Sequence, residues 1–223
     1  MLNIMVFAPH PDDDIIACGG SMAKHLRQGN QVQVVYLTSG EAGSHKYSKE
    51  ELAVIRKEEA RRATASLGIK QISFLGMPDG YISYTRENLL TLVNIIRSER
   101  PSLIYVPHAQ EAVRDHHFTW QLVIEACTKA AGPWFQDCPT PPWSTSNILA
   151  YEVWTPLQQP SYIEDITSFM NDKLTALRCH QSQLEMIQYD EAVEGLNRYR
   201  GVMSGQGQYC EAFQVIKIGG PLC

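Results

Sequence analysis

The chain has 223 residues, of which 44% are hydrophobic and 19% charged, with a formal net charge of −5 and a pI near 5.8. This composition is typical of a soluble globular protein, and the acidic balance disfavours nucleic acid and anionic membranes, which attract basic surfaces. No apolar run approaches the ~20 residues that span a bilayer, and the first residues lack the basic and apolar segments of a signal peptide.

Apolar runs alternate with helical patterns along the first 131 residues. Strands are expected at 2–8, 31–38, 71–77 and 102–108, and helices at 15–29, 49–68, 86–100 and 117–131. Four consecutive strand-then-helix units predict a parallel sheet that is covered by helices on both faces.

This alternation breaks down after residue 132. The segment 132–147 is rich in Pro and Trp and is expected to form a loop. Strands are expected at 148–155 and 211–218 and a helix at 168–184, whereas 190–209 has four glycines and little pattern. Because no segment resembles a long linker, we expect a single domain over residues 1–223.

The cysteines indicate the cellular compartment. There are six, at positions 18, 127, 138, 179, 210 and 223, and no two of them are spaced as C-x-x-C. A zinc ribbon or a thioredoxin motif is therefore not expected. The chain is neither short nor rich in cysteine, so we expect reduced thiols and a cytoplasmic location.

Polar clusters follow the ends of the expected parallel strands. They lie at 10–14, 38–41, 78–80 and 107–117. The carboxyl ends of parallel strands share one edge of a sheet, and ligands bind outside that edge. The sequence therefore gathers its unusual side chains at a single rim.

The first cluster has the composition of a metal site. His10 and the three acids Asp12, Asp13 and Asp14 stand where a dinucleotide-binding protein carries glycines, and three acids would repel a pyrophosphate. His and Asp are ligands of zinc and similar divalent metals, and a third ligand is expected from the "RDHH" of 114–117, as His116 or His117. Two His and one Asp leave positions for water and substrate.

One carboxylate remains beside such a metal. Asp12 or Asp14 would act as general base toward a water whose pKa zinc lowers to about 7. A simpler alternative is that "DDD" and "DHH" are only acidic helix N-termini. Their joint placement after the first and fourth strands favours the metal site, and with it a hydrolase.

Six segments resemble one known family. "APHPDDDIIACGG", "LTSGEAG", "IRKEEARRATASLGI", "FLGMPDG", "RDHH" and "CEAFQV" are similar, in this order, to motifs of the LmbE/PIG-L family of zinc-dependent de-N-acetylases. The resemblance covers nearly the whole chain. It implies a Rossmann-like three-layer α/β sandwich with a mostly parallel sheet, and it favours assembly into a homo-oligomer.

The resemblance also implies residue roles. It makes His10, Asp13 and His116 the metal ligands and Asp12 the general base. Arg56 would bind substrate, and Asp115 would orient a neighbouring imidazole.

The chain departs from the family at one catalytic position. Val113 stands where many members carry a histidine that protonates the leaving amine or stabilises the oxyanion. His108, His117 and His180 are the candidate replacements, Glu111 is a nearby acid, and we expect His180 to take the role.

The expected activity is hydrolysis of the acetamide of an N-acetylated sugar or glycoconjugate. The expected cofactor is Zn²⁺, although Fe²⁺ suits the same ligands. Two alternatives remain: hydrolysis of another small amide conjugate, and a sugar- or metal-binding homologue with little turnover, which Val113 suggests.

Overall fold

The computed structural model describes residues 1–136 and 138–222. Its seven-stranded sheet has the order β3-β2-β1-β4-β5-β7-β6. The strands are β1 (Asn3–Ala8), β2 (Gln31–Tyr36), β3 (Gln71–Phe74), β4 (Leu103–Pro107), β5 (Asn147–Tyr151), β6 (Tyr162–Asp165) and β7 (Cys210–Lys217). The pairs from β3 to β5 are parallel, and β7 runs antiparallel to both of its neighbours.

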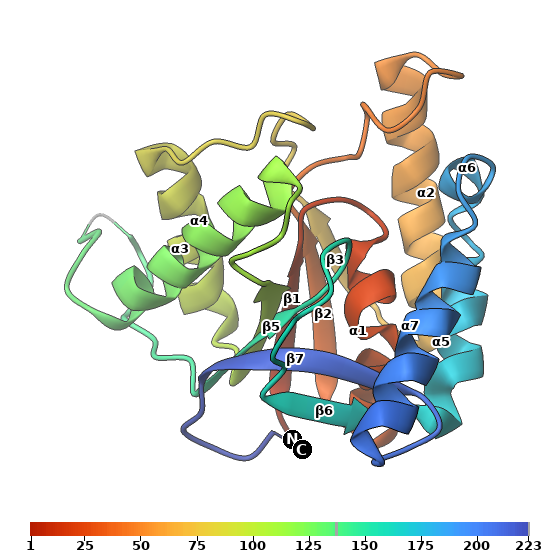
Figure 1. Ribbon diagram of the computed structural model, residues 1–223. Helices are drawn as coiled ribbons and strands as arrows, with labels where there is room; N and C mark the ends of the chain where they lie inside the picture. The colour runs from red at the N-terminus through yellow and green to blue at the C-terminus, as the bar shows by residue number, and fades with distance from the viewer. Residues whose placement is uncertain (137, 223) are drawn as a thin grey trace.

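Helices cover both faces of the sheet, so the predicted three-layer α/β architecture with a mostly parallel sheet is confirmed. They are α1 (Asp13–Arg27), α2 (Lys49–Leu67), α3 (Arg86–Glu99), α4 (Arg114–Ala131), α5 (Met170–Leu177), α6 (Gln181–Leu184) and α7 (Tyr189–Ser204), with a short 3₁₀ helix η1 (Thr167–Phe169). In Figure 1, α3 and α4 lie on one side of the sheet and α1, α2, α5 and α7 on the other.

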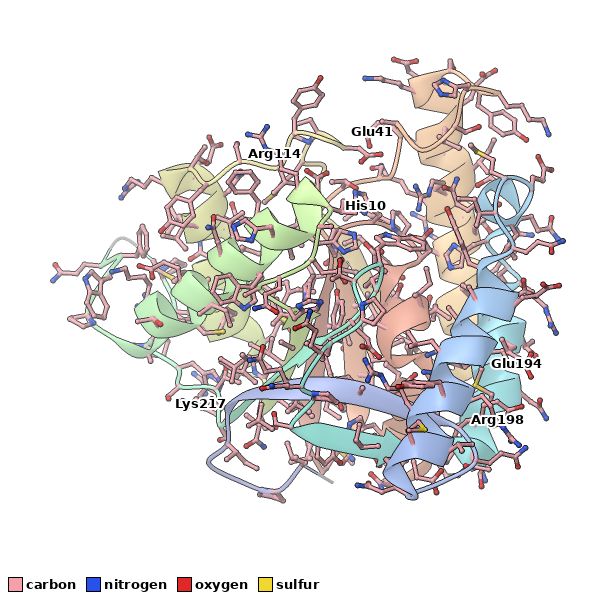
Figure 2. All side chains as sticks on the ribbon, in the orientation of Figure 1. His10, Glu41, Arg114, Glu194, Arg198 and Lys217 are labelled. Atoms are coloured by element: carbon pink, nitrogen blue, oxygen red, sulfur yellow. The ribbon has the colours of Figure 1, made fainter. Side chains whose placement is uncertain are left out.

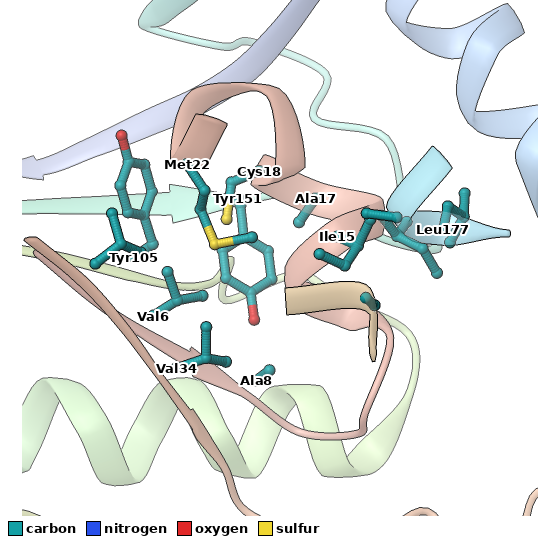
Figure 3. Close-up of a cluster of buried hydrophobic side chains, with 14 of the residues drawn as sticks. Val6, Ala8, Ile15, Ala17, Cys18, Met22, Val34, Tyr105, Tyr151 and Leu177 are labelled. Carbon is teal, nitrogen blue, oxygen red and sulfur yellow. The ribbon is translucent and has the colours of Figure 1, made fainter. Parts of the chain in front are cut away.

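Alternate residues of the central strands supply two cores. Val6 and Ala8 of β1 pack into the core under α1, while Met5 and Phe7 pack into the core under α3 and α4. Figure 3 shows Val6 and Ala8 together with Tyr151 in the first of these cores. Both faces of β1 are buried, as expected for a central parallel strand, and its carboxyl end is therefore held rigidly.

All eight elements expected within residues 2–131 are present, with boundaries that differ by up to three residues. Local capping interactions fix both ends of helix α2, which is why the sequence predicts its boundaries well. Ser48 accepts from the Glu51 N–H at 3.2 Å while the Glu51 carboxylate accepts from the Ser48 N–H at 2.9 Å, and Gly68 ends the helix with a φ of 92°.

The last third differs from the expectation in three places. The helix expected at 168–184 is divided into η1, α5 and α6, and β6 was not predicted. The glycine-rich segment 190–209, in which no element was expected, contains most of α7. Gly201 explains part of this, because a Cβ there would lie 2.6 Å from the backbone of Gln208, so a glycine is needed for packing inside a helix.

The described helices and cysteines bear on two expectations, that the chain has no membrane span and that its thiols are reduced. Within residues 1–136 and 138–222, none of the helices has the length and apolarity needed to cross a bilayer. The five cysteines in these ranges are free, as expected, and Cys223 lies outside them. The loop expected at 132–147 includes residue 137, which also lies outside the described residues.

A buried ion pair supports the first helix from the far end of the chain. Helix α1 is kinked at Cys18, and the N–H groups of Gly20 and Ser21 beyond the kink donate to the Glu211 carboxylate at 2.9 and 2.8 Å. The Lys173 ammonium lies 2.7 Å from the same carboxylate, and neither side chain is exposed. Glu211 of β7 thus caps the second half of α1 while Lys173 balances its charge.

We expect Lys173→Met to lower the free energy of unfolding by about 3–5 kcal/mol, because Glu211 would stay buried without a counter-charge. Urea unfolding measures this loss. The double variant Lys173→Met/Glu211→Gln should recover part of it, since glutamine removes the buried charge while its one amide oxygen still accepts from a helix N–H group. A double variant as unstable as the single one would show that packing, rather than charge, is what was lost.

Candidate functional site

A tight turn after β1 brings the first polar cluster to the edge of the sheet. The N–H groups of Asp12 and Asp13 donate to the His10 carbonyl at 2.9 and 3.3 Å, and α1 begins at Asp13. The Asp12 side chain makes no capping bond to the helix. All three carboxylates that follow His10 are buried, with Asp14 fully so, and each therefore needs a partner from elsewhere in the fold.

Asp13 lies between two imidazoles. Its Oδ2 is 3.1 Å from His10 Nδ1 and 3.3 Å from His116 Nε2, and one ligand atom from each residue lies within 4.8 Å of the others. Four ligands at about 2.0–2.1 Å around a zinc ion are separated by roughly 3.3 Å along the edges of the tetrahedron. The spacing therefore fits three protein ligands of one metal ion.

Unpartnered atoms support the same interpretation. Asp13 Oδ1 and both ring nitrogens of His116 are buried and have no hydrogen-bond partner. Burial raises the pKa of Asp13, but His116 and His10 outweigh it and hold that pKa well below its usual range. A buried carboxylate kept ionised beside an unpartnered imidazole is a donor set that a divalent cation would satisfy.

The second nitrogen of His10 faces two other acids. His10 Nε2 is 3.1 Å from Asp79 Oδ1 and 3.3 Å from Asp115 Oδ2. Asp115 also accepts the N–H groups of Gly80 and Ile82, at 2.7 and 3.2 Å. These three side chains form a second possible metal-binding group, but Asp115 is already bonded to backbone, so we interpret both acids as orienting the His10 ring with Nδ1 toward Asp13.

Arg56 binds the acid that sequence reasoning assigned as general base. Arg56 Nη2 lies 2.9 Å from Asp12 Oδ1, and its Nη1 donates to the Gly40 carbonyl at 3.1 Å. Burial raises the pKa of Asp12, Arg56 counteracts that rise, and the pKa stays above its usual value. A guanidinium so engaged positions Asp12. Arg56 also lines the pocket described below, so the substrate contact expected of it stays a prediction.

Asp14 has a different environment. The Tyr36 hydroxyl donates to Asp14 Oδ2 at 2.9 Å. Burial raises the pKa of Asp14 to about 7. Asp14 is not among the residues that line the pocket described next, so of the two alternatives for a general base the geometry favours Asp12.

A pocket of about 170 Å³ opens beside these groups. Its walls come from the loops after several strands and from α2, α6 and α7: His10, Asp12, Asp13, Ala42, Gly43, Arg56, Asp79, Trp154, Gln183 and Tyr189. Figure 2 shows His10 at this end of the sheet, with Glu41 near it. Sequence reasoning placed 78–80 at this rim but did not select Asp79. It also missed Trp154, Gln183 and Tyr189, because Trp154 and Gln183 lie within an expected strand and an expected helix whose patterns do not mark them as site residues, and Tyr189 lies outside every expected element.

His180 does not line this pocket, although its ring is fully buried. Burial and the nearby Arg56 lower the pKa of His180 to about 3, so the ring is neutral at physiological pH. A neutral imidazole outside the pocket is poorly placed to protonate a leaving nitrogen. The role expected of His180 stays a prediction that this geometry does not favour.

The other candidate histidines are bound to the protein itself. His108 Nε2 donates to the Thr155 carbonyl at 2.7 Å, and His117 Nδ1 donates to the Ala109 carbonyl at 3.0 Å. Neither lines the pocket. His116, rather than His117, is the histidine that lies next to Asp13. The histidine of the described pocket lining is His10, which is a candidate metal ligand. The described lining therefore offers no other histidine as the proton donor that is missing at Val113.

Comparisons with known proteins agree with the fold and the motifs. The PIG-L family, described as GlcNAc-PI de-N-acetylase, matches residues 5–127. Diacetylchitobiose deacetylase of Thermococcus kodakarensis is 32% identical, covering 96% of this chain and 83% of that protein. The structure of N,N'-diacetylchitobiose deacetylase from Pyrococcus horikoshii superimposes with a TM-score of 0.87 at 31% identity, over 96% of this chain and 83% of that one.

A relative with a different activity also matches. The 4-oxalmesaconate hydratase of Pseudomonas putida is 26% identical, covering 84% of this chain and 76% of that protein. A hydratase adds water to a substrate, whereas a deacetylase uses water to cleave one. The proteins that are similar to this chain are therefore named for two different reactions in which water is a reactant.

We expect His116→Ala to bind zinc more than about 100-fold more weakly than the parent chain, because removal of a ligand should cost at least as much as loss of a group that supports one. Competition with a chelator measures the affinity. His117→Ala is the matched control, since that ring is bonded to Ala109. Equal affinity for His116→Ala and the control would exclude His116 as a ligand.

We expect His180→Ala to keep the shape of the pH–rate profile between about pH 5 and pH 9, since a group with a pKa of about 3 does not titrate there. The absolute rate can fall because a buried ring is removed. Loss of one limb of the profile in this variant would instead restore His180 as a proton donor.

Proposed function

Because the chain belongs to the PIG-L family of GlcNAc-PI de-N-acetylase-like proteins, we propose that it hydrolyses the acetamide of an N-acetylated sugar to acetate and a free amine. One observation carries the proposal: Asp12 lines the same pocket as His10 and Asp13, and Asp13 touches His116. A base is thus placed beside a set of metal ligands, at the edge of the sheet where substrates bind.

We propose Zn²⁺ as the cofactor, held by His10, Asp13 and His116, with Fe²⁺ as a second metal that the same ligands accept. When bound, the metal would supply Lewis-acid chemistry, polarising the acetyl carbonyl and lowering the pKa of water. Asp79 and Asp115 would keep the His10 ring oriented for this role.

Asp12 takes the proton of the attacking water. Its raised pKa makes it a stronger base than an exposed carboxylate, and Arg56 fixes its position at 2.9 Å. The pocket lining has no histidine free to serve as a separate acid. Asp12 therefore also returns that proton to the leaving nitrogen as the C–N bond breaks, so that one carboxyl group acts first as base and then as acid.

Tyr189 supplies a donor on another wall of the same pocket. Burial and the nearby Asp12 raise the pKa of Tyr189, which keeps its hydroxyl protonated. This hydroxyl and the Gln183 amide would hydrogen-bond the sugar and orient its acetamide. These two residues would join Arg56, which lines the same pocket, in contacting the substrate.

The proposal also covers the domain organisation, the cellular location and the assembly of the protein. We propose that residues 1–223 act as one domain, because a single sheet takes strands from Asn3 to Lys217. A cytoplasmic location is supported by the free thiols of the described cysteines. Assembly into a homo-oligomer stays a prediction from the family resemblance.

A substrate panel tests the proposed reaction. The zinc-loaded protein should release acetate from N-acetylglucosamine or N,N'-diacetylchitobiose, and chelation followed by zinc should abolish and restore the release. Hydration of 4-oxalmesaconate without acetate release would favour the alternative set by the hydratase relative. Zinc binding without any turnover on the panel would favour a binding protein.

We expect Asp12→Asn to keep zinc but to lose roughly 10²–10⁴-fold in the rate of acetate release, because asparagine preserves shape and removes the basic lone pair. Asp14→Asn is the matched control, since Asp14 is held by Tyr36 away from the pocket lining. A larger loss in the Asp14 variant than in the Asp12 variant would reverse the assignment of the base.

A further inference from the structure

A second cavity, of about 250 Å³, lies next to the candidate catalytic pocket. It is formed between α1, the segment after β5, and α7, with one residue from β7. Its lining residues are Ile16, Ala17, Glu152, Val153, Trp154, Pro156, Tyr189, Ala192, Val193, Leu196, Asn197 and Ala212. Ile16 and Ala17 belong to the hydrophobic core under α1, in which Figure 3 shows Ala17, so this wall of the cavity continues the core surface.

The walls of this cavity are mostly apolar and carry no free charge. The only ionisable acid in the lining is Glu152, and both of its oxygens are engaged. Arg200 donates to Glu152 from Nε at 3.0 Å and from Nη2 at 2.6 Å, and the Leu157 N–H donates to it at 2.6 Å. A charged group would lose water here without finding a counter-charge, whereas an apolar group would gain by leaving water. Asn197 Oδ1, which is buried without a hydrogen-bond partner, is a single polar point in this otherwise apolar lining.

The two cavities share two residues. Trp154 and Tyr189 line both of them, and their rings lie 4.9 Å apart. Ile16 and Ala17 are also close in sequence to Asp12 and Asp13, one turn further along α1. The two cavities therefore share this pair as a common wall, and a substituent long enough to pass beside the two rings from an amide at Asp12 would reach the apolar cavity.

We propose that this cavity binds an uncharged alkyl or aryl chain of the substrate, and hence that the natural substrate is an N-acylated sugar with an apolar substituent. This inference rests on the proposed function. The chain can be attached in two ways, through the glycosidic oxygen or as a longer acyl group. The chemistry that the cavity recognises is the same in both cases.

Two substrate series distinguish these attachments. One series consists of alkyl glycosides of N-acetylglucosamine from methyl to hexyl, and the other of glucosamines N-acylated with acetyl to hexanoyl. We expect kcat/KM to rise about fourfold for each methylene that enters the cavity in one series, from the transfer free energy of a CH₂ group. The series that rises identifies the attachment, and a flat response in both would overturn the proposal.

A filled cavity is the second test. Ala192 is an exposed residue of α7 that lines the cavity, so Ala192→Trp should occupy the space with little effect on folding. The ratio of hexyl to methyl kcat/KM, or of hexanoyl to acetyl, should then fall toward one. Val202→Trp on the same helix is the control, because Val202 is 61% exposed and outside the lining. An equal ratio in both variants would overturn the proposal.

A binding measurement separates this inference from the proposed function. Hexyl β-D-glucoside and hexanoate lack the amide, and one of them should raise the Tm of the parent chain and of Val202→Trp but not of Ala192→Trp. This pattern without hydrolysis of any amide would defeat the proposed function and leave the cavity assignment standing. Hydrolysis with no effect of chain length and no Tm shift would defeat the cavity assignment alone.

Discussion

Three consecutive carboxylates are buried at the carboxyl end of β1, and the fold is organised by the need to give each one a partner. Ionised carboxylates are costly to bury unless a cation or a set of donors compensates for the lost water. Asp12 receives Arg56, Asp13 receives His10 and His116, and Asp14 receives the Tyr36 hydroxyl. His10 belongs to the same turn as the three acids, whereas the other partners come from α2, α4 and β2. Pairing the three acids therefore brings three distant elements to the same edge of the sheet.

Different partners give the three acids different chemistry. Asp13, between imidazoles, stays ionised and suits a cation, whereas burial raises the pKa of Asp14 to about 7 although the Tyr36 hydroxyl lowers it. Asp12 combines burial with a guanidinium and lines the pocket. Residues of one type at adjacent positions can therefore serve as ligand, base and structural acid, because the surroundings rather than the residue type set each role.

The parts that sequence could predict are those with a local physical cause. Buried parallel strands are continuous apolar runs, helix ends carry caps such as Ser48 and Gly68, and the ends of parallel strands must share an edge. The features that the sequence could not predict depend on contacts between residues that are far apart in the chain. Helix α7 forms despite its glycines because it packs on the sheet, and Asp79 is recognised only through its distance to His10. His180 lies within the helical pattern read over 168–184, but the structure ends α5 at Leu177 and begins α6 at Gln181. Its burial, which the pattern does not reveal, lowers its pKa.

The cap that Glu211 provides to α1 joins groups 190 residues apart. A ribosome delivers the chain from its N-terminus, so α1, which carries the first acids of the site, is made well before Glu211, the residue that caps its second half. The segment 5–127 that matches the family holds the metal-ligand motifs but lacks both Glu211 and Lys173. This segment therefore lacks the ion pair that caps the second half of α1, and a nascent chain can complete that cap only after Glu211 has been made.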